Sequence, residues 1–142
     1  MPNSIKIPYT DLRNAFGEVT ARPILPVELT YQGVSVQVAG LVDSGADVNV
    51  LPYGLGVSLG LHWGEQRYSL HFSGNLANFD TRVVVLPARI ADFATVDFAF
   101  ARTQAEQAPL IFGQTNTFQA FDVCFLRSER YFTLSLKGTS AA

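Results

Sequence analysis

Two apolar segments joined by a short acidic turn constrain the fold of this chain more than any other feature. The segments are 36–42 and 48–51, and the turn between them, 43–46, reads Asp-Ser-Gly-Ala. An unpaired buried carboxylate is costly, so an aspartate between two apolar strands needs a structural or chemical reason. Glycine lets the backbone turn sharply and lets another backbone approach closely. The stretch therefore predicts two buried strands that present the Asp43 carboxylate on a rigid turn.

The sequence leaves two interpretations of Asp43. In the first, Asp43 only caps the turn, because Asp-Ser-Gly is common turn chemistry. In the second, the apolar flanks place the turn in the core layer, where a carboxylate on a rigid backbone is suited to acid–base catalysis. The flanking strands favour the second interpretation.

Length and composition exclude several classes of protein. The 142 residues suffice for one domain, and 48% apolar with 15% charged residues supply a sizeable core. The net charge is −2 and the ten Lys and Arg form no basic run, which argues against a nucleic-acid partner. The single cysteine excludes an internal disulfide framework. Because no apolar run reaches the length of a membrane span or a signal-peptide core, we expect a soluble, cytoplasmic protein without a membrane partner.

Alternating apolar and polar residues recur along the chain and predict short strands. The clearest lie at 27–31, 34–38, 83–86, 96–100, 121–125 and 132–136. Only 53–60 and 114–120 have a helical pattern. These patterns predict an all-β barrel or sandwich with one or two short helices. We expect an N-terminal arm at 1–22, one domain at 23–138 and a flexible tail at 139–142.

Two other patterns give only weak evidence of a functional site. The G-x-S-x-G of 56–60 matches the nucleophile elbow of hydrolases, but only His62 and His71 follow it, too soon for that fold. A glycine-rich helix and its end explain it better. The spacing of both histidines and Cys124 fits no zinc pattern, so we expect no metal and no cofactor. We expect Trp63 to fill the core.

The sequence resembles the retropepsin-like aspartic proteases, the single-lobed relatives of pepsin, in three places. The first is LVDSGA at 41–46, followed by an apolar run that ends in Leu-Pro. The second is the glycine-containing turn at 73–75, where the family has its flap hairpin. The third is Ile-Phe-Gly at 111–113, followed by a short helix and the strand FDVCF. The match covers roughly 26–136, and it implies a closed or partly open barrel of the acid-protease type, active as a two-fold dimer.

The resemblance implies an aspartic endopeptidase in which two nearby carboxylates share one proton, because like charges disfavour double ionisation. The ionised member takes a proton from a water, and the protonated member polarises the scissile carbonyl. The chain contains one Asp-Ser-Gly turn, and the Asp-Thr-Arg of 80–82 lacks the glycine. The second carboxylate is therefore expected from Asp43 of a second copy, in a symmetric homodimer. Segments 5–9 and 132–136 are expected to complete the dimer sheet.

The resemblance also assigns roles around Asp43. Ser44 is expected to hydrogen-bond across the dimer interface, and Gly45 is expected to let the substrate backbone lie alongside. The flap hairpin is expected to close over an extended peptide. The residues expected to bind substrate are Ala46, Asp47, Ser73, Gly74, Asn75 and Leu76.

The chain departs from the viral members of the family next to the turn. In those enzymes the carboxylate four positions after the catalytic one pairs with an Arg that directly follows the late glycine. Asp47 keeps the carboxylate, but Gln114 stands where the Arg would be. Asp47 is therefore expected either to pair with another cation, such as Arg82 or Arg102, or to bind the substrate backbone.

Two functions follow from these patterns. The first is an aspartic endopeptidase that cleaves extended peptides with apolar side chains near the cut. The second is a dimeric peptide-binding or scaffold module of the same fold, with weak or absent hydrolysis. Cleavage that depends on Asp43 distinguishes the two.

Overall fold

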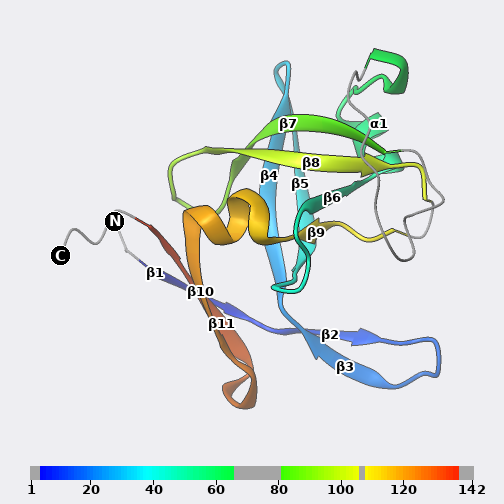
Figure 1. Cartoon of the computed structure of the whole chain (residues 1–142). Helices are drawn as coiled ribbons and strands as arrows, with labels where there is room; N and C mark the ends of the chain where they lie inside the picture. The colour runs from blue at the N-terminus through cyan, green and yellow to red at the C-terminus, as the bar shows by residue number, and fades with distance from the viewer. Residues whose placement is uncertain (1–3, 66–80, 106–107, 138–142) are drawn as a thin grey trace.

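The computed structural model describes residues 4–65, 81–105 and 108–137. Six strands form a closed barrel in the order β4-β5-β9-β6-β8-β7 (Figure 1). They are β4 (Ile24–Tyr31), β5 (Val34–Val42), β6 (Asn49–Pro52), β7 (Thr81–Arg89), β8 (Val96–Thr103) and β9 (Ile111–Phe112). The predicted all-β barrel is confirmed.

Two smaller sheets lie outside the barrel in Figure 1. The chain ends form a three-stranded sheet in the order β1-β11-β10, from β1 (Ser4–Pro8), β10 (Phe121–Leu126) and β11 (Tyr131–Leu136). The second sheet is a hairpin of β2 (Thr10–Arg13) and β3 (Val19–Arg22). The helices are short: α1 (Tyr53–Ser58), η1 (Trp63–Glu65), η3 (Gln114–Phe118), which is interrupted at Thr115 and Asn116, and η4 (Arg127–Glu129).

The β4–β5 hairpin leads directly to the Asp43 turn. Its two-residue loop places Gln32 at φ 47° and Gly33 at φ 82°, the left-handed conformations that match the twist of a hairpin. Alternation along β4 buries Leu25, Val27 and Leu29 against the barrel core. The hairpin therefore forms as its sequence pattern predicts.

Two prolines lie inside barrel strands. Strand β4 runs through Pro26, which lies opposite Ala39 of β5. Strand β7 continues past Pro87 to Arg89. Both prolines are exposed, where a missing amide donor is best tolerated.

Aromatic side chains fill the middle of the barrel. Phe98 and Phe100 of β8 each pack edge-to-face on Phe112 of β9, with ring centroids 6.1 Å and 6.3 Å apart. All three rings are fully buried. Each such pair adds about 0.5–1.5 kcal/mol beyond its buried area. These contacts fix the two-residue strand β9 in the barrel.

Arg102 of β8 is a fully buried cation. Its Nη1 donates to the carbonyl of Leu61 at 3.2 Å, and its Nη2 donates to the carbonyl of Tyr53 at 3.0 Å. The guanidinium stacks on the rings of Tyr53 and Trp63, 4.5 Å and 5.6 Å from their centroids. Burial lowers the pKa of Arg102, and the neighbouring Tyr53 raises that pKa by less. The prediction that Trp63 fills the core is wrong, because this half-buried ring packs on a guanidinium instead.

The two chain ends pair with each other within one chain. Ile5 lies opposite Leu134, and Ile7 lies opposite Phe132, while β10 pairs with the other edge of β11. Both edges of β11 are therefore occupied, and β1 and β10 are the outer strands of this sheet. A partner cannot add a strand to β11 without displacing one of its neighbours.

The G-x-S-x-G segment forms a helix and its end, as predicted. The hydroxyl of Ser58 donates to the carbonyl of Gly54 within α1, and Gly60 follows the helix with φ 84°. Across 4–65, 81–105 and 108–137, no helix has the length and apolarity to span a membrane. The His, Cys, Asp and Glu side chains of the same residues form no cluster of three or more suited to a metal ion.

Candidate active site

The Asp43 turn lies where three barrel strands meet. Strand β9 runs between β5 and β6, parallel to the first and antiparallel to the second (Figure 1). Val42 pairs with Phe112, and Val50 pairs with Ile111. The amide of Asp43 continues the ladder and donates to the carbonyl of Phe112 at 3.0 Å. A strand from late in the chain thus holds both ends of the turn.

One of the two carboxylate oxygens of Asp43 accepts a hydrogen bond from its own chain. Its Oδ1 accepts a hydrogen bond from the amide of Gly45 at 2.9 Å, so Asp43 does cap the turn. The second oxygen has no hydrogen-bond partner in the part of the chain that the structure describes. Turn capping and catalysis are compatible, because capping fixes the carboxylate and leaves one oxygen to act.

The turn itself is at the surface of one chain. Val42 and Val50 on either side are buried, but Asp43 is half-buried and both Ser44 and Gly45 are exposed. The expectation that the turn lies in the core layer is therefore wrong for a single chain. The barrel interior takes the strands, and their connection comes out at the end of the barrel.

Two residues that follow β9 clamp the backbone of the turn. The amide of Gln114 donates to the carbonyl of Ala46, and its side-chain Nε2 donates to the carbonyl of Ser44, both at 2.8 Å. The amide and hydroxyl of Thr115 both donate to the carbonyl of Asp47, at 3.0 Å and 2.8 Å. Gln114, which stands where the viral enzymes have an Arg, therefore binds the backbone of the turn.

Gly113 packs directly against the turn. A Cβ atom at this position would lie 2.6 Å from the carbonyl oxygens of both Ala46 and Val48. No side chain fits at that distance, because both neighbours are backbone atoms. The glycine of the Ile-Phe-Gly motif therefore allows the close approach of two backbones.

Asn49 is a site residue that the sequence analysis missed. It is fully buried, and its Oδ1 accepts hydrogen bonds from the amide of Gly113 at 2.8 Å and the hydroxyl of Thr117 at 3.0 Å. Its Nδ2 donates to the carbonyl of Ala99 at 2.9 Å. The signal was a polar side chain inside the apolar run 48–51, because buried polar groups need partners.

Replacing Asn49 with leucine should lower the free energy of unfolding by about 3 kcal/mol, since it leaves two or more buried polar groups without partners at about 1–3 kcal/mol each. Urea denaturation measures the change. Gln104→Leu is the control, because Gln104 is exposed, and its stability should change by less than about 0.5 kcal/mol. Equal effects of the two substitutions would contradict the role of Asn49.

The deciding comparison is with a retropepsin-like aspartic protease from Rickettsia conorii. The two structures superpose with a TM-score of 0.64 over 94% of this chain and 90% of that chain, at 13% sequence identity. The chain has the retropepsin-like fold. The EIAV protease in complex with an inhibitor also matches, with a TM-score of 0.48 over 72% of this chain and 88% of that chain, at 16% identity. No protein-family model and no curated protein matches the sequence.

The carboxylate of Asp47 has no ion-pair partner among the residues that the structure of this retropepsin-like chain describes. Arg102 is committed to carbonyls inside the barrel, and Arg82 lies over the Trp63 ring, 4.9 Å from its centroid. Pairing of Asp47 with either arginine is therefore not observed. The remaining alternative, that exposed Asp47 binds substrate backbone, stays a prediction.

The predicted flap residues Ser73, Gly74, Asn75 and Leu76 lie outside the described residues, and so does His71. Their assignment stays a prediction from the resemblance.

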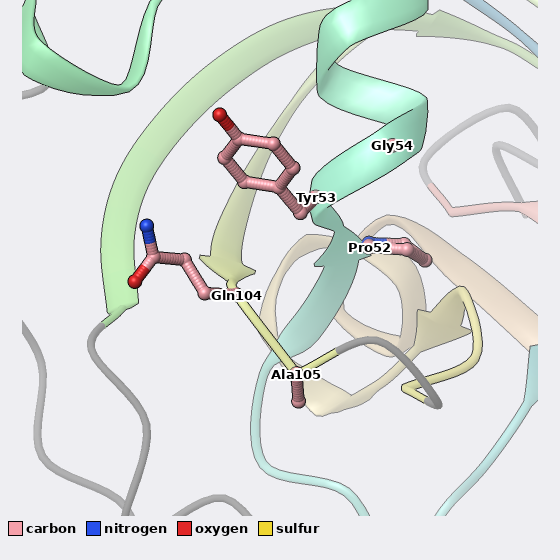
Figure 2. Close-up of a pocket in the computed structure, with 5 residues that line it drawn as sticks. All are labelled: Pro52, Tyr53, Gly54, Gln104 and Ala105. Atoms are coloured by element: carbon pink, nitrogen blue, oxygen red, sulfur yellow. The ribbon is translucent and has the colours of Figure 1, made fainter.

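A recess of about 460 Å³ opens at the other end of β6. Figure 2 shows the side chains of Tyr53 and Gln104 on one side of it, and Pro52, Gly54 and Ala105 also line it. The Asp43 turn lies just before the first residue of β6. The recess lies at the opposite end of this strand, where it is lined by the last residue, Pro52. Of the predicted site residues that the structure describes, which are residues 43–47, none lines the recess.

Proposed function

We propose that the chain is an aspartic endopeptidase that acts as a homodimer, with one catalytic carboxylate from Asp43 of each copy. One observation carries the proposal. In a retropepsin-like fold, a single Asp-Ser-Gly turn is fixed at the surface by hydrogen bonds to its backbone, and one Asp43 oxygen has no hydrogen-bond partner among the described residues. A surface turn of this kind is half of a two-carboxylate site and needs a second copy to complete it.

The proposed chemistry needs two carboxylates and a water. At close range the pair holds one proton, because double ionisation is disfavoured. The ionised Asp43 removes a proton from the water, whose oxygen attacks the peptide carbonyl carbon. The protonated Asp43 of the second copy donates its proton to the carbonyl oxygen. The C–N bond of the tetrahedral intermediate then breaks: the nitrogen takes the proton that the first carboxylate removed from the water, and the second carboxylate takes a proton back from one hydroxyl of the intermediate. The products are an amine and a carboxylic acid, and the pair again holds one proton.

The neighbouring residues support a shared site. The hydroxyl of Ser44 is exposed and makes no hydrogen bond within the described residues, so it can donate across the interface. Gly45 is exposed and presents no side chain to an extended substrate. We propose that Asp47, together with Ala46, contacts the substrate backbone.

A peptide-binding dimer without hydrolysis is the second candidate. The hydrogen bond from the Gly45 amide to Asp43 accounts for the aspartate as a turn cap without any catalysis. The glutamine at the position of the family's Arg is the other observation in its favour.

Cleavage of a peptide library by the purified protein between acid and neutral pH tests the proposal. We expect cleavage between apolar residues that persists in a metal chelator and is blocked by a peptide whose secondary alcohol mimics the tetrahedral intermediate, because such mimics bind more tightly than substrates. Specific activity should fall on dilution as dimers dissociate. Peptide binding without cleavage at every pH would instead establish the binding module.

Gln114→Ala should lower the free energy of unfolding by only about 1 kcal/mol, the scale of one exposed hydrogen bond, yet lower kcat about 10-fold because the turn loses its tie to Ser44. Peptide hydrolysis and urea denaturation measure both effects on the same samples. Gln37→Ala is the matched control, since Gln37 is an exposed glutamine on β5. A stability loss without a kcat effect would contradict the positioning role.

A further inference from the structure

The β2–β3 hairpin, residues 10–22, is a two-stranded sheet of its own, and we call it the arm. Three of its apolar side chains are in solvent: Leu12 is 44% exposed, Phe16 is 88% exposed and Val19 is 56% exposed. Figure 1 shows the arm extending away from the sheet of the chain ends, and among the described residues no third strand pairs with it. An isolated hairpin is marginally stable in water, and removing its apolar side chains from water lowers the free energy.

The tip of the arm has a defined conformation. The Oδ1 of Asn14 accepts hydrogen bonds from the amides of Phe16 and Glu18, both at 2.9 Å. The amide of Asn14 donates to the carbonyl of Glu18 at 2.8 Å, and Gly17 supplies the positive φ of 80° that the loop requires. The tip therefore holds Phe16 in place before any contact, which lowers the entropic cost of binding.

The root of the arm is bonded to the strand that carries the Asp43 turn. The carbonyl of Pro23, directly after the arm, accepts a hydrogen bond from the amide of Val42 at 3.0 Å, and Val42 precedes Asp43. In the proposed dimer, the second copy approaches at this end of the barrel. Each four-residue strand extends the arm roughly 14 Å from its root, at about 3.4 Å per residue.

We propose that the arm of each copy lies against the other copy of this chain, with Leu12, Phe16 and Val19 as its anchors. The inference rests on the proposed function. Each strand of the arm has an edge without a pairing strand among the described residues, and the arm starts beside Asp43. Its four charged residues sum to zero, so two-fold related arms do not repel. They are Asp11, Arg13, Glu18 and Arg22.

The apolar surface of the three anchors is large enough to contribute to a dimer interface. Burial of one aromatic side chain removes about 150–250 Å² from water. Two reciprocal arms with three anchors each would therefore supply a substantial share of the roughly 1,600 Å² of a stable interface.

Sedimentation equilibrium on Phe16→Asp and Val19→Asp, with peptide cleavage on the same samples, tests the proposal. We expect the dimer dissociation constant to rise about 30-fold for Phe16→Asp, the size of an interface hot spot. Val85→Asp is the matched control, because Val85 of β7 is 56% exposed, the same fraction as Val19. Its dissociation constant should change by less than about threefold. Thermal unfolding verifies that all three variants fold.

The outcomes separate this inference from the proposed function. Dimeric arm variants, in an enzyme whose cleavage depends on Asp43, would overturn the arm contact and leave the function intact. A wild-type chain that stays monomeric would overturn both. Weakened dimers whose cleavage returns at high protein concentration support the arm contact, while lost cleavage in intact dimers would assign the arm to substrate and overturn it. A second measurement uses a photocrosslinker attached to the cysteine of Phe16→Cys, with Cys124→Ser removing the native thiol. If the arm contacts the second copy, illumination should yield a product of twice the chain mass.

Discussion

Asp43→Asn should reduce peptide cleavage at least about 10²–10⁴-fold, the contribution of general acid–base groups, because an amide can neither ionise nor hold the shared proton. The dimer and the fold should persist, since asparagine keeps the oxygen that accepts from the Gly45 amide at 2.9 Å. Cleavage rate, sedimentation and thermal unfolding measure the three properties. Asp97→Asn is the control, because Asp97 is an exposed aspartate of β8, and its activity should stay unchanged.

Mixing the wild-type chain with the Asp43→Asn chain makes the prediction sharper. Mixed dimers carry one carboxylate and should be inactive, so at equal amounts random pairing leaves about a quarter of the dimers active. Activity that falls only in proportion to the wild-type chain would mean that each copy works alone. That result would overturn the shared dyad even if Asp43 itself were essential.

Gly113→Ala should lower the free energy of unfolding by about 2–3 kcal/mol, the cost of forcing extra volume into a packed site. The new methyl group would lie 2.6 Å from two backbone carbonyl oxygens, those of Ala46 and Val48, and neither can move without shifting the turn. Cleavage should fall more steeply than stability, because a displaced Asp43 loses its alignment with the second carboxylate. Urea denaturation and kcat/KM measure the two effects.

Gly54→Ala provides the opposite case for the same chemical change. A Cβ atom at Gly54 would meet no atom within 4 Å, and the residue lies in α1. Alanine is favoured over glycine in a helix by about 0.5–1 kcal/mol, so this variant should be as stable as the wild type or more stable. Similar destabilisation by both alanines would refute the packing argument at Gly113.

The sequence predicts the parts of the fold that local periodicity specifies. Alternation reveals β4, β5 and the first half of β8 because successive side chains there differ in burial, and Gly33 marks the hairpin between the first two strands. The arm shows no such signal, because neither of its faces is buried in one chain. Strand β9 has two residues and no period, so its position between β5 and β6 could be inferred only from the resemblance.

The residues of the candidate site also fall into those that the sequence predicts and those that it does not. Asp43, Gly45 and Gly113 stand out because their residue types are unusual between apolar strands. Asn49 interrupts the apolar run 48–51, but the partners of Asn49 and Arg102 cannot be predicted, because they lie 41 to 68 residues away in the chain. Such long-range partners leave no local pattern, and only the structure brings them together.

The place of β9 between β5 and β6 also determines when the Asp43 turn can take its final geometry during synthesis. A nascent chain that has left the ribosome as far as residue 105 already contains Asp43, but it lacks Ile111 and Phe112, which align that turn. Closing so long a loop is slow compared with forming the β4–β5 hairpin. The Asp43 turn therefore reaches the geometry described above only after residues 111 and 112 have been made and have paired with β5 and β6.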